Sequence, residues 1–429
     1  MKKIWGIIIC LAVAPVLRAQ EILTLKSCYE RAAQVSALAA EKAAHSEIWQ
    51  RTDKNLQKQW MPTIDAGGTL QYNSSVIDMK DIIGRLPLSG IENLLNPLPH
   101  EQYKLTVDIS QTLYDGGAVK SARALGEAEL RLNEKQTDTE LFQLKNQVNT
   151  VYFSLLLMRR QKELLHNYDT LIEKRIASTQ SAVDNGVILQ ADLDALQAEK
   201  IKLGQQLSEN EIRTASLSAI LSDLTGLPVT PSTELAFPLP AEETLPGIFR
   251  PELEIFDLKK EQLSASLKLL NSKRKPRAVG FSTLGYGNPP GNNFFRDEFA
   301  PFFIVGATVK WNIFDWDRSK REREIIGFQQ QILENRKKDL SDELERLLES
   351  KRAEIAALRK LTESDGELIA LRKKITSSAE SRYKNGTLTA TAYLQEFNAE
   401  KEAVITREIH RINLALAQVE YLTLSGKEF

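Results

Sequence analysis

The sequence predicts a mixed α/β chain, mainly α-helical, in which one unit of two strands and a long helical hairpin occurs twice in tandem. The main observation is a set of similar positions that recur at a fixed offset of 200 residues (385 − 185 = 200). These pairs are Asn185-Gly186 with Asn385-Gly386, Asp115 with Asp315, and Gly226 with Gly426. Self-similarity at a fixed spacing indicates an internal repeat. The second observation is that alternating, strand-like segments precede each long helical segment.

The chain opens with a segment typical of a secretory signal peptide. Lys2 and Lys3 precede an apolar run from Ile4 to Leu17. This run is too short for a transmembrane helix and has the length of an export signal. We expect cleavage after Ala19, so that the signal peptide covers residues 1–19. Cys28 is then the only cysteine, which excludes an intrachain disulfide.

The charge balance argues against nucleic acid as the main partner. The chain has 56 basic and 57 acidic residues, and loss of Lys2, Lys3 and Arg18 leaves 53 basic residues (56 − 3 = 53) and a net charge of −4 (53 − 57 = −4). A nucleic-acid-binding protein would show a basic excess. The sequence also shows no later apolar run of transmembrane length, so we expect any crossing of a membrane to be made by strands.

The first repeat, residues 20–226, begins with a helix and continues with two strands. The segment from about Leu23 to Gln59 lacks proline and glycine and predicts one long helix, which Pro62 ends. Apolar and polar residues then alternate at about 63–74 and again at about 102–114. A period of two is typical of strands, so we expect two strands with one apolar and one polar face.

A helical hairpin completes the first repeat at about 118–225. We expect Asp115 to cap the first helix, because a carboxylate can accept the free amides of the first turn. Asn185-Gly186 supplies the positive-φ residues that a sharp reversal needs. The two strands are separated by a segment from Val76 to Pro99 that is rich in Pro, Gly and Asn, which indicates a surface loop.

A proline-rich linker at 227–249 leads into the second repeat, residues 250–429, which predicts the same elements in the same order. Its strands are expected at about 277–287 and 302–314, and its helical hairpin at 317–426.

The four strands have the length that a transmembrane β-strand needs. Four strands cannot close a barrel, and an open edge in lipid would leave backbone groups unpaired. Twelve strands from three chains would enclose a lumen, although strand length alone does not exclude a dimer. Soluble strands that cover a helical core are the other interpretation. Aromatic residues near strand ends favour the membrane, and those expected at the interface are Trp60, Tyr72, Tyr103, Phe303 and Trp311.

Several motifs together carry a family resemblance. They are Leu113-Tyr114-Asp115-Gly116-Gly117, Ile313-Phe314-Asp315-Trp316-Asp317, the two Asn-Gly tips, and Arg250-Pro251-Glu252-Leu253. With these landmarks in register in both repeats, the chain resembles the TolC family of outer membrane efflux proteins, the outer membrane factors. The resemblance implies a trimer in the outer membrane of a Gram-negative bacterium, with a 12-stranded β-barrel and an α-helical barrel that extends into the periplasm.

The resemblance also implies partners and a periplasmic entrance. The hairpin tips would contact a periplasmic adaptor (membrane fusion) protein, joined to an inner-membrane pump of the RND, ABC or MFS type. The residues expected at the entrance are Asn185, Gly186, Asp192, Tyr383, Asn385 and Gly386. In family members an aspartate and a tyrosine at the positions of Asp192 and Tyr383 help to hold the entrance shut, which one charge-assisted hydrogen bond could do. The alternative is a solvated Asp192 and a Tyr383 packed between helices.

The sequence departs from the family in the second tip. Leu388, Ala392 and Gln395 replace residues that are charged in well-described members, which argues against a cation-selective entrance. On the polar strand faces, the residues expected to line the lumen are Asp65, Thr69, Lys104, Asp108, Thr308 and Lys310. Because their charges have both signs, we expect them to keep a wide pore hydrated and not to select strongly between ions. The basic segment Lys273–Arg277 is expected near lipid headgroups.

The sequence therefore predicts a passive outer-membrane exit duct for a tripartite efflux or type I secretion system, opened at its helix tips by an adaptor. A soluble periplasmic coiled-coil adaptor or scaffold is the alternative. We expect no enzyme, cofactor or metal site, because the histidines are dispersed and no catalytic motif has its required setting.

Overall fold

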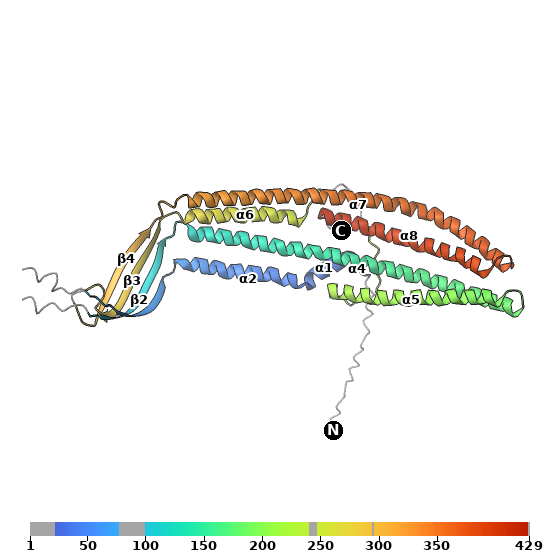
Figure 1. The fold of residues 1–429 in the computed structure, drawn as a ribbon, viewed down its shortest axis with the longest axis horizontal. Helices are drawn as coiled ribbons and strands as arrows, with labels where there is room; N and C mark the ends of the chain where they lie inside the picture. The colour runs from blue at the N-terminus through green and yellow to red at the C-terminus, as the bar shows by residue number, and fades with distance from the viewer. Residues whose placement is uncertain (1–21, 77–98, 240–246, 294–295, 428–429) are drawn as a thin grey trace, which may run out of the picture. The chain divides into compact units, whose positions relative to one another are not determined.

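The computed structural model describes residues 22–76, 99–239, 247–293 and 296–427 (Figure 1). The predicted signal peptide, residues 1–19, lies outside the described residues. So do most of the loop between the first two strands, residues 77–98, and part of the proline-rich linker, residues 240–246.

The chain divides into two compact units, and each unit combines segments from both repeats. Unit 1 comprises Met1–Ala40, Asp138–Pro251 and Leu340–Phe429. Unit 2 comprises Glu41–Thr137 and Glu252–Asp339. The duplication therefore does not produce one unit per repeat, because matching parts of the two repeats pack together.

Unit 2 contains a sheet of four antiparallel strands in the order β1-β2-β3-β4. The strands are β1 (Thr63–Tyr72), β2 (Glu101–Tyr114), β3 (Arg277–Asn288) and β4 (Ala300–Lys310). The register places β2 beside β3, so that the central pairing joins the two repeats. β1 and β4 are the edge strands, and within the described chain each pairs on one side only.

Strand β4 ends earlier than the alternation of the sequence suggests. We expected it to reach residue 314, but its last pair is Lys310 with Arg277. Arg277 follows Pro276, which has no amide hydrogen and cannot extend the ladder. The chain then turns into the next helix through Trp316 and Asp317, whose φ angles are 52° and 58°.

Unit 2 also contains most of helix α2 (Ala37–Gln57) and of α6 (Pro251–Ser272), and the short 3-10 helix η1 (Lys58–Trp60). The first parts of α4 (Ala118–Asp184) and α7 (Arg318–Lys384) belong to it as well. The single helix expected from Leu23 to Gln59 is wrong. Instead, α1 (Leu25–Val35) ends at Ser36, whose backbone is extended with ψ 134°. The Ser36 hydroxyl accepts a hydrogen bond from the Leu38 amide at 3.3 Å, and serine often competes with helical bonds in this way.

The long hairpin helices have equal lengths in the two repeats. α4 and α7 each have 67 residues, while α5 (Gln190–Thr225) and α8 (Ala390–Ser425) each have 36. The predicted cap at Asp115 is confirmed, since its carboxylate accepts the amides of Gly117 at 2.8 Å and Val119 at 2.6 Å. In the second repeat Asp315 accepts the Ser319 amide at 3.1 Å.

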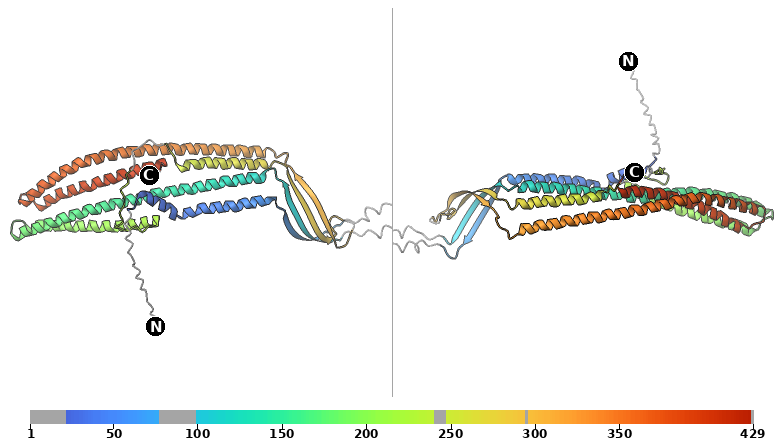
Figure 2. Two further views of the ribbon diagram at one scale, coloured as in Figure 1. Left: turned by 180° about the vertical axis from the view of Figure 1, so that it is seen from behind. Right: turned by 90° about the horizontal axis from the view of Figure 1, so that it is seen from above.

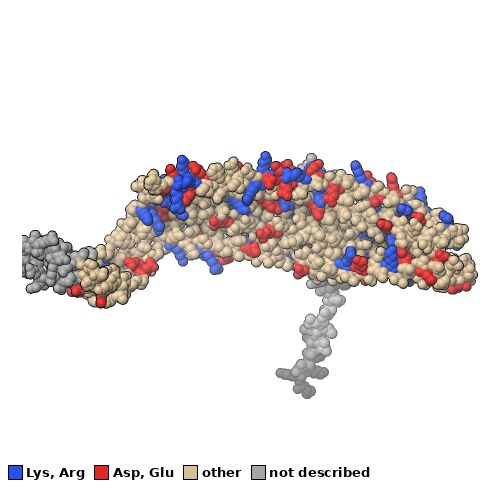
Figure 3. All heavy atoms as spheres, in the orientation of Figure 1, with Lys and Arg blue, Asp and Glu red and all other residues tan. Residues whose placement is uncertain are grey.

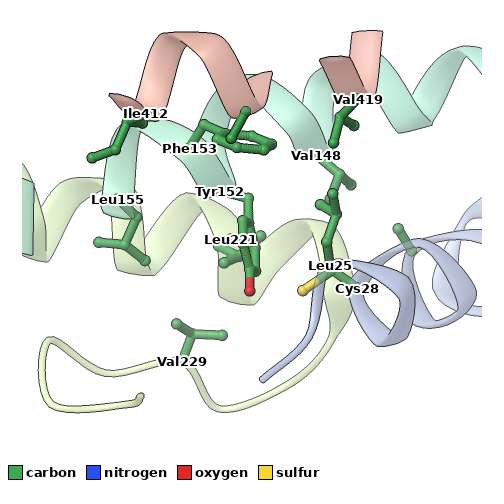
Figure 4. Packing of buried hydrophobic residues seen from close by; sticks show 12 residues of the cluster. Leu25, Cys28, Val148, Tyr152, Phe153, Leu155, Leu221, Val229, Ile412 and Val419 are labelled. Carbon is green, nitrogen blue, oxygen red and sulfur yellow. The ribbon is translucent and has the colours of Figure 1, made fainter. Parts of the chain in front are cut away.

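The hydrophobic core of unit 1 forms where α1, α4, α5 and α8 meet the segment after α5. Leu25, Cys28, Tyr152, Leu221 and Val419 are fully or almost fully buried in it (Figure 4). The Tyr152 hydroxyl donates to one or both of two carbonyls, Leu23 O at 2.8 Å and Ala236 O at 2.7 Å, so this core also holds the linker against the helices.

No helix in the described ranges is both long enough and apolar enough to cross a bilayer.

Candidate functional site at the hairpin tips

The two hairpin tips of unit 1 have the same backbone geometry and lie at the same end of that unit (Figure 2). Gly186 and Gly386 adopt φ angles of 71° and 67°. In the first tip the Val187 amide donates to Ala182 O at 2.8 Å, and the equivalent bond closes the second tip at 2.9 Å. This is the helix ending in which a left-handed glycine lets the chain bond back to the last turn. The predicted turns at both Asn-Gly pairs therefore form.

The two tips differ where the next helix begins. Leu189, at the start of α5, makes no side-chain cap, whereas the hydroxyl of Thr389 accepts the Ala392 amide of α8 at 3.3 Å. The carboxylate of Asp192, in the first turn of α5, accepts a hydrogen bond from the Ala390 amide at 2.8 Å. A residue of the first hairpin thus completes the N-terminus of a helix in the second, where backbone amides lack helical partners.

Tyr383 is packed between the helices, with only 2% of its surface exposed. Its hydroxyl and the hydroxyl of Thr179 share a hydrogen bond of 3.1 Å, and its ring stacks on Tyr393 with 5.6 Å between centroids. Burial raises the pKa of Tyr383, and the nearby charge of Asp192 acts in the same direction. Asp192 and Tyr383 line one cavity of about 330 Å³, but within the chain each bonds to another partner.

An ion pair joins α4 to α7 close to these residues. Arg175 pairs with Glu380, and its guanidinium lies 5.3 Å from the centre of the Tyr393 ring. Burial acts to raise the pKa of Glu380, but hydrogen bonds from Lys384 and Arg175 outweigh it and leave the pKa below its usual value. Sequence reasoning missed Arg175 and Glu380, because nothing local in the sequence shows that two charges 205 positions apart meet (380 − 175 = 205).

The first tip exposes two apolar side chains. Val187 is 70% exposed and Leu189 is 73% exposed, whereas the matching positions of the second tip are Thr387 and Thr389. Asn185 supports the turn by donating from its side chain to Ser181 O at 2.7 Å.

The residues expected to line a lumen lie on one face of the sheet in unit 2. The register pairs Asp65 with Asp108 and Thr69 with Lys104. Tyr72 and Tyr103 lie on the opposite, apolar face, toward the end of the sheet that is away from the helices. Trp60 and Trp311 lie outside the strands, next to the helix end of the sheet. Phe303 pairs with Leu284 in the middle of the sheet, away from both ends.

No group of three or more potential metal-binding side chains is found within the part of the chain that the structure describes.

Comparison with known proteins identifies the family. The model of the family described as "Outer membrane efflux protein" matches residues 29–226, which is the first repeat almost from end to end. Residues 29–226 of this chain therefore match the outer membrane efflux protein family. No curated protein matches the chain.

Solved structures show that the likeness in fold extends over both repeats. A membrane protein from Pseudomonas aeruginosa is 14% identical; the match covers 94% of this chain and 90% of that protein, with a TM-score of 0.70. VceC from Vibrio cholerae is also 14% identical; the match covers 93% of this chain and 96% of VceC, with a TM-score of 0.66. The outer membrane channel CmeC from Campylobacter jejuni is 13% identical; the match covers 94% of this chain and 85% of CmeC, with a TM-score of 0.66.

The family match and the shared fold support an outer-membrane efflux channel component. Its family consists of transport ducts that work as trimers with adaptor proteins and inner-membrane pumps, and is not an enzyme family. The soluble periplasmic adaptor is the less favoured interpretation.

Proposed function

We propose that three copies of this chain form a passive exit duct in the outer membrane, serving a tripartite efflux pump or a type I secretion system. The sheet of unit 2 carries this proposal. Its apolar face is open to the surroundings, with Ile64, Leu105 and Val305 exposed by 68%, 66% and 71%. A soluble protein rarely leaves so continuous an apolar surface uncovered, whereas lipid would cover it.

The edges of the sheet support a closed assembly. β1 and β4 each lack a second partner strand within the described chain. In lipid, each unpaired backbone group costs several kcal/mol, so the edges would pair with those of neighbouring copies. Three sheets of four strands would give a 12-stranded barrel, wide enough for a water-filled lumen.

The hairpin tips are the proposed contact with the adaptor protein. Val187 and Leu189 offer exposed apolar surface there, and Asp192 lies between the two tips. Adaptor binding would shift the tips from a closed to an open arrangement, and a pump of the RND, ABC or MFS type in the inner membrane would supply the energy. We propose no catalytic step in the duct itself.

The test is to extract the protein from outer membranes in detergent, measure its native mass, and insert it into planar bilayers. We expect three chains per particle, a requirement for detergent, and discrete conductance steps. A monomer that stays in solution without detergent would contradict the duct and support the soluble coiled-coil scaffold instead.

A further inference from the structure

We propose that Lys58, Arg277 and Lys310 form a cationic collar on the polar face of the sheet, at the end where strands meet helices, and that this collar binds anions and favours anionic cargo. The inference rests on the proposed function, because a collar can select cargo only if copies of the sheet enclose a lumen. It names a substrate class for the duct.

Two cations of the collar are direct neighbours in the sheet. Arg277 of β3 pairs in register with Lys310 of β4. Arg277 points to the same face as Thr283, six residues further along β3, because successive side chains alternate. The Thr283 hydroxyl bonds to Asp108, which identifies this as the polar face. Like charges directly opposite each other destabilise a strand pair, and an anion held between them would remove that repulsion.

Lys58 joins the collar through a shared cavity. Lys58 and Arg277 line a space of about 340 Å³ together with the hydroxyl side chains of Thr63, Ser110 and Thr112. Ammonium, guanidinium and hydroxyl groups all donate hydrogen bonds, as a phosphate, sulfate or carboxylate ligand requires.

No carboxylate forms an ion pair with the three cations of the collar in the described chain. In the described chain, neither an ion pair nor a side-chain hydrogen bond is found for Lys58, Arg277 or Lys310, although all three are exposed. Asp115 lines the same cavity, but its carboxylate already accepts the amides of Gly117 and Val119 at the start of α4.

The acidic residues of the polar face lie well away from the Arg277–Lys310 pair, although Asp65 and Asp108 are each two residues from Thr63 and Ser110 of the cavity. Asp108 pairs with Thr283, six residues from Arg277 along β3, which is about 20 Å at a strand rise of about 3.3 Å per residue. The Debye length at physiological ionic strength is about 8 Å, so the charge of Asp108 acts separately from those of Arg277 and Lys310. In the view of Figure 3, Lys and Arg gather over the helix ends next to the strands.

The inference is tested by ion selectivity in planar bilayers under a KCl gradient. The variant carries Lys58→Gln, Arg277→Gln and Lys310→Gln. Its control is Lys273→Gln, an exposed cation of the turn between α6 and β3 that is not on a strand. We expect a wild-type pore that favours chloride and a fall of about threefold or more in the anion-to-cation permeability ratio of the variant, since a charged lining concentrates counter-ions. The difference should shrink at 1 M salt, where the Debye length is about 3 Å.

A second readout does not depend on an open entrance. Fluorescence anisotropy of a pyrene trisulfonate dye should report binding to the detergent-solubilised wild-type and Lys273→Gln proteins, and at least tenfold weaker binding to the triple variant. The native mass of each variant shows whether it assembles. If the triple variant does not assemble, the single variants Lys310→Gln and Arg277→Gln are measured in its place. A conducting pore with the same selectivity in all variants would overturn the collar and leave the duct intact. Inserted trimers without any conductance would instead contradict the proposed function.

Discussion

Asp192 shows at the scale of one residue how the two hairpins of a chain are joined. Its carboxylate caps α8 from the first turn of α5, through the bond to the Ala390 amide. We predict that Asp192→Ala destabilises the start of α8 by about 1 kcal/mol, the usual cost of losing a cap. Hydrogen exchange of the amides in α8's first turn should become roughly fivefold faster.

The matched control is Asp194→Ala, because Asp194 is exposed and its side chain bonds only to Gln190 of its own helix. Equal protection of α8 in the two variants would show that the Asp192 cap contributes nothing to the start of α8. The same pair of variants bears on the entrance, since faster exchange together with higher conductance would indicate that the cap helps to keep the tips together.

Cys28 is a reporter of the core at the same scale. The thiol is fully buried, and burial raises its pKa from 9.0 to about 12. The thiolate is the reactive form, so at pH 8 roughly one molecule in ten thousand carries it. We predict almost no alkylation by iodoacetamide in the native protein and complete alkylation in denaturant. Rapid alkylation of the native protein would contradict the packing of α1 in unit 1.

The sign of the pH effect follows from the same shift. Because the folded pKa is raised, burial of the neutral thiol stabilises the fold fully below about pH 9, and this contribution is lost as the pH rises from 9 toward 12. A Cys28→Ala variant should therefore lose less stability than the wild type over that range.

At the scale of elements, two glycines with similar φ angles differ in how much space surrounds them. Gly386 has φ 67°, and an added Cβ would meet nothing within 4 Å. Gly116 has φ 69°, but its Cβ would lie 2.6 Å from Lys275 Cβ and 3.0 Å from Ser272 O. We predict that Gly386→Ala lowers the free energy of unfolding by about 1 kcal/mol through backbone strain. Gly116→Ala should lower it clearly more, because the turn at Gly116 must also move away from the turn at Ser272–Lys275. Thermal unfolding of the two variants tests the order, and equal costs would contradict the close packing at the junction.

The two faces of β4 provide a second prediction at this scale. Val305 lies on the apolar face and Thr308 on the polar face of the same strand. An arginine on a lipid-facing position near the bilayer midplane costs about 2–4 kcal/mol, whereas one that faces water costs little. We expect Val305→Arg to reduce the amount of folded protein in outer membranes severalfold, and Thr308→Arg to leave it nearly unchanged. The opposite order would reverse the assignment of the faces.

These elements also show what the sequence could and could not predict. The repeat offset and the Asn-Gly pairs predicted both tips, because a left-handed glycine is a local requirement. The break at Ser36 was missed, since it depends on one hydroxyl that bonds to the Leu38 amide within an otherwise helical segment. The partners of Asp192 and Arg175 were missed because they come from another hairpin, and a single sequence carries no signal for contacts at that separation. The roles proposed for the entrance and lumen residues remain predictions.

At the scale of the whole molecule, the open edges of the sheet determine how copies must meet. If β1 of one copy pairs with β4 of the next, residues on the polar faces of these strands will lie within disulfide range at some register. Cys28→Ser removes the only cysteine of the expected mature chain and gives a clean background. Thr69→Cys would then be combined, one at a time, with cysteine at Phe302, Ile304, Gly306 or Thr308.

We predict that at least one of these combinations forms intermolecular disulfides on oxidation, and that denaturing gels show crosslinked chains up to three and no larger. Three is the expected limit because a closed ring uses every edge, whereas an open chain of copies would continue to grow. Lys104→Cys combined with the same β4 positions is the control, since β2 is paired on both sides within its own chain and its cysteine cannot reach another copy. Crosslinks that extend beyond three chains, or an absence of crosslinks at all four positions, would contradict a trimer closed through β1 and β4.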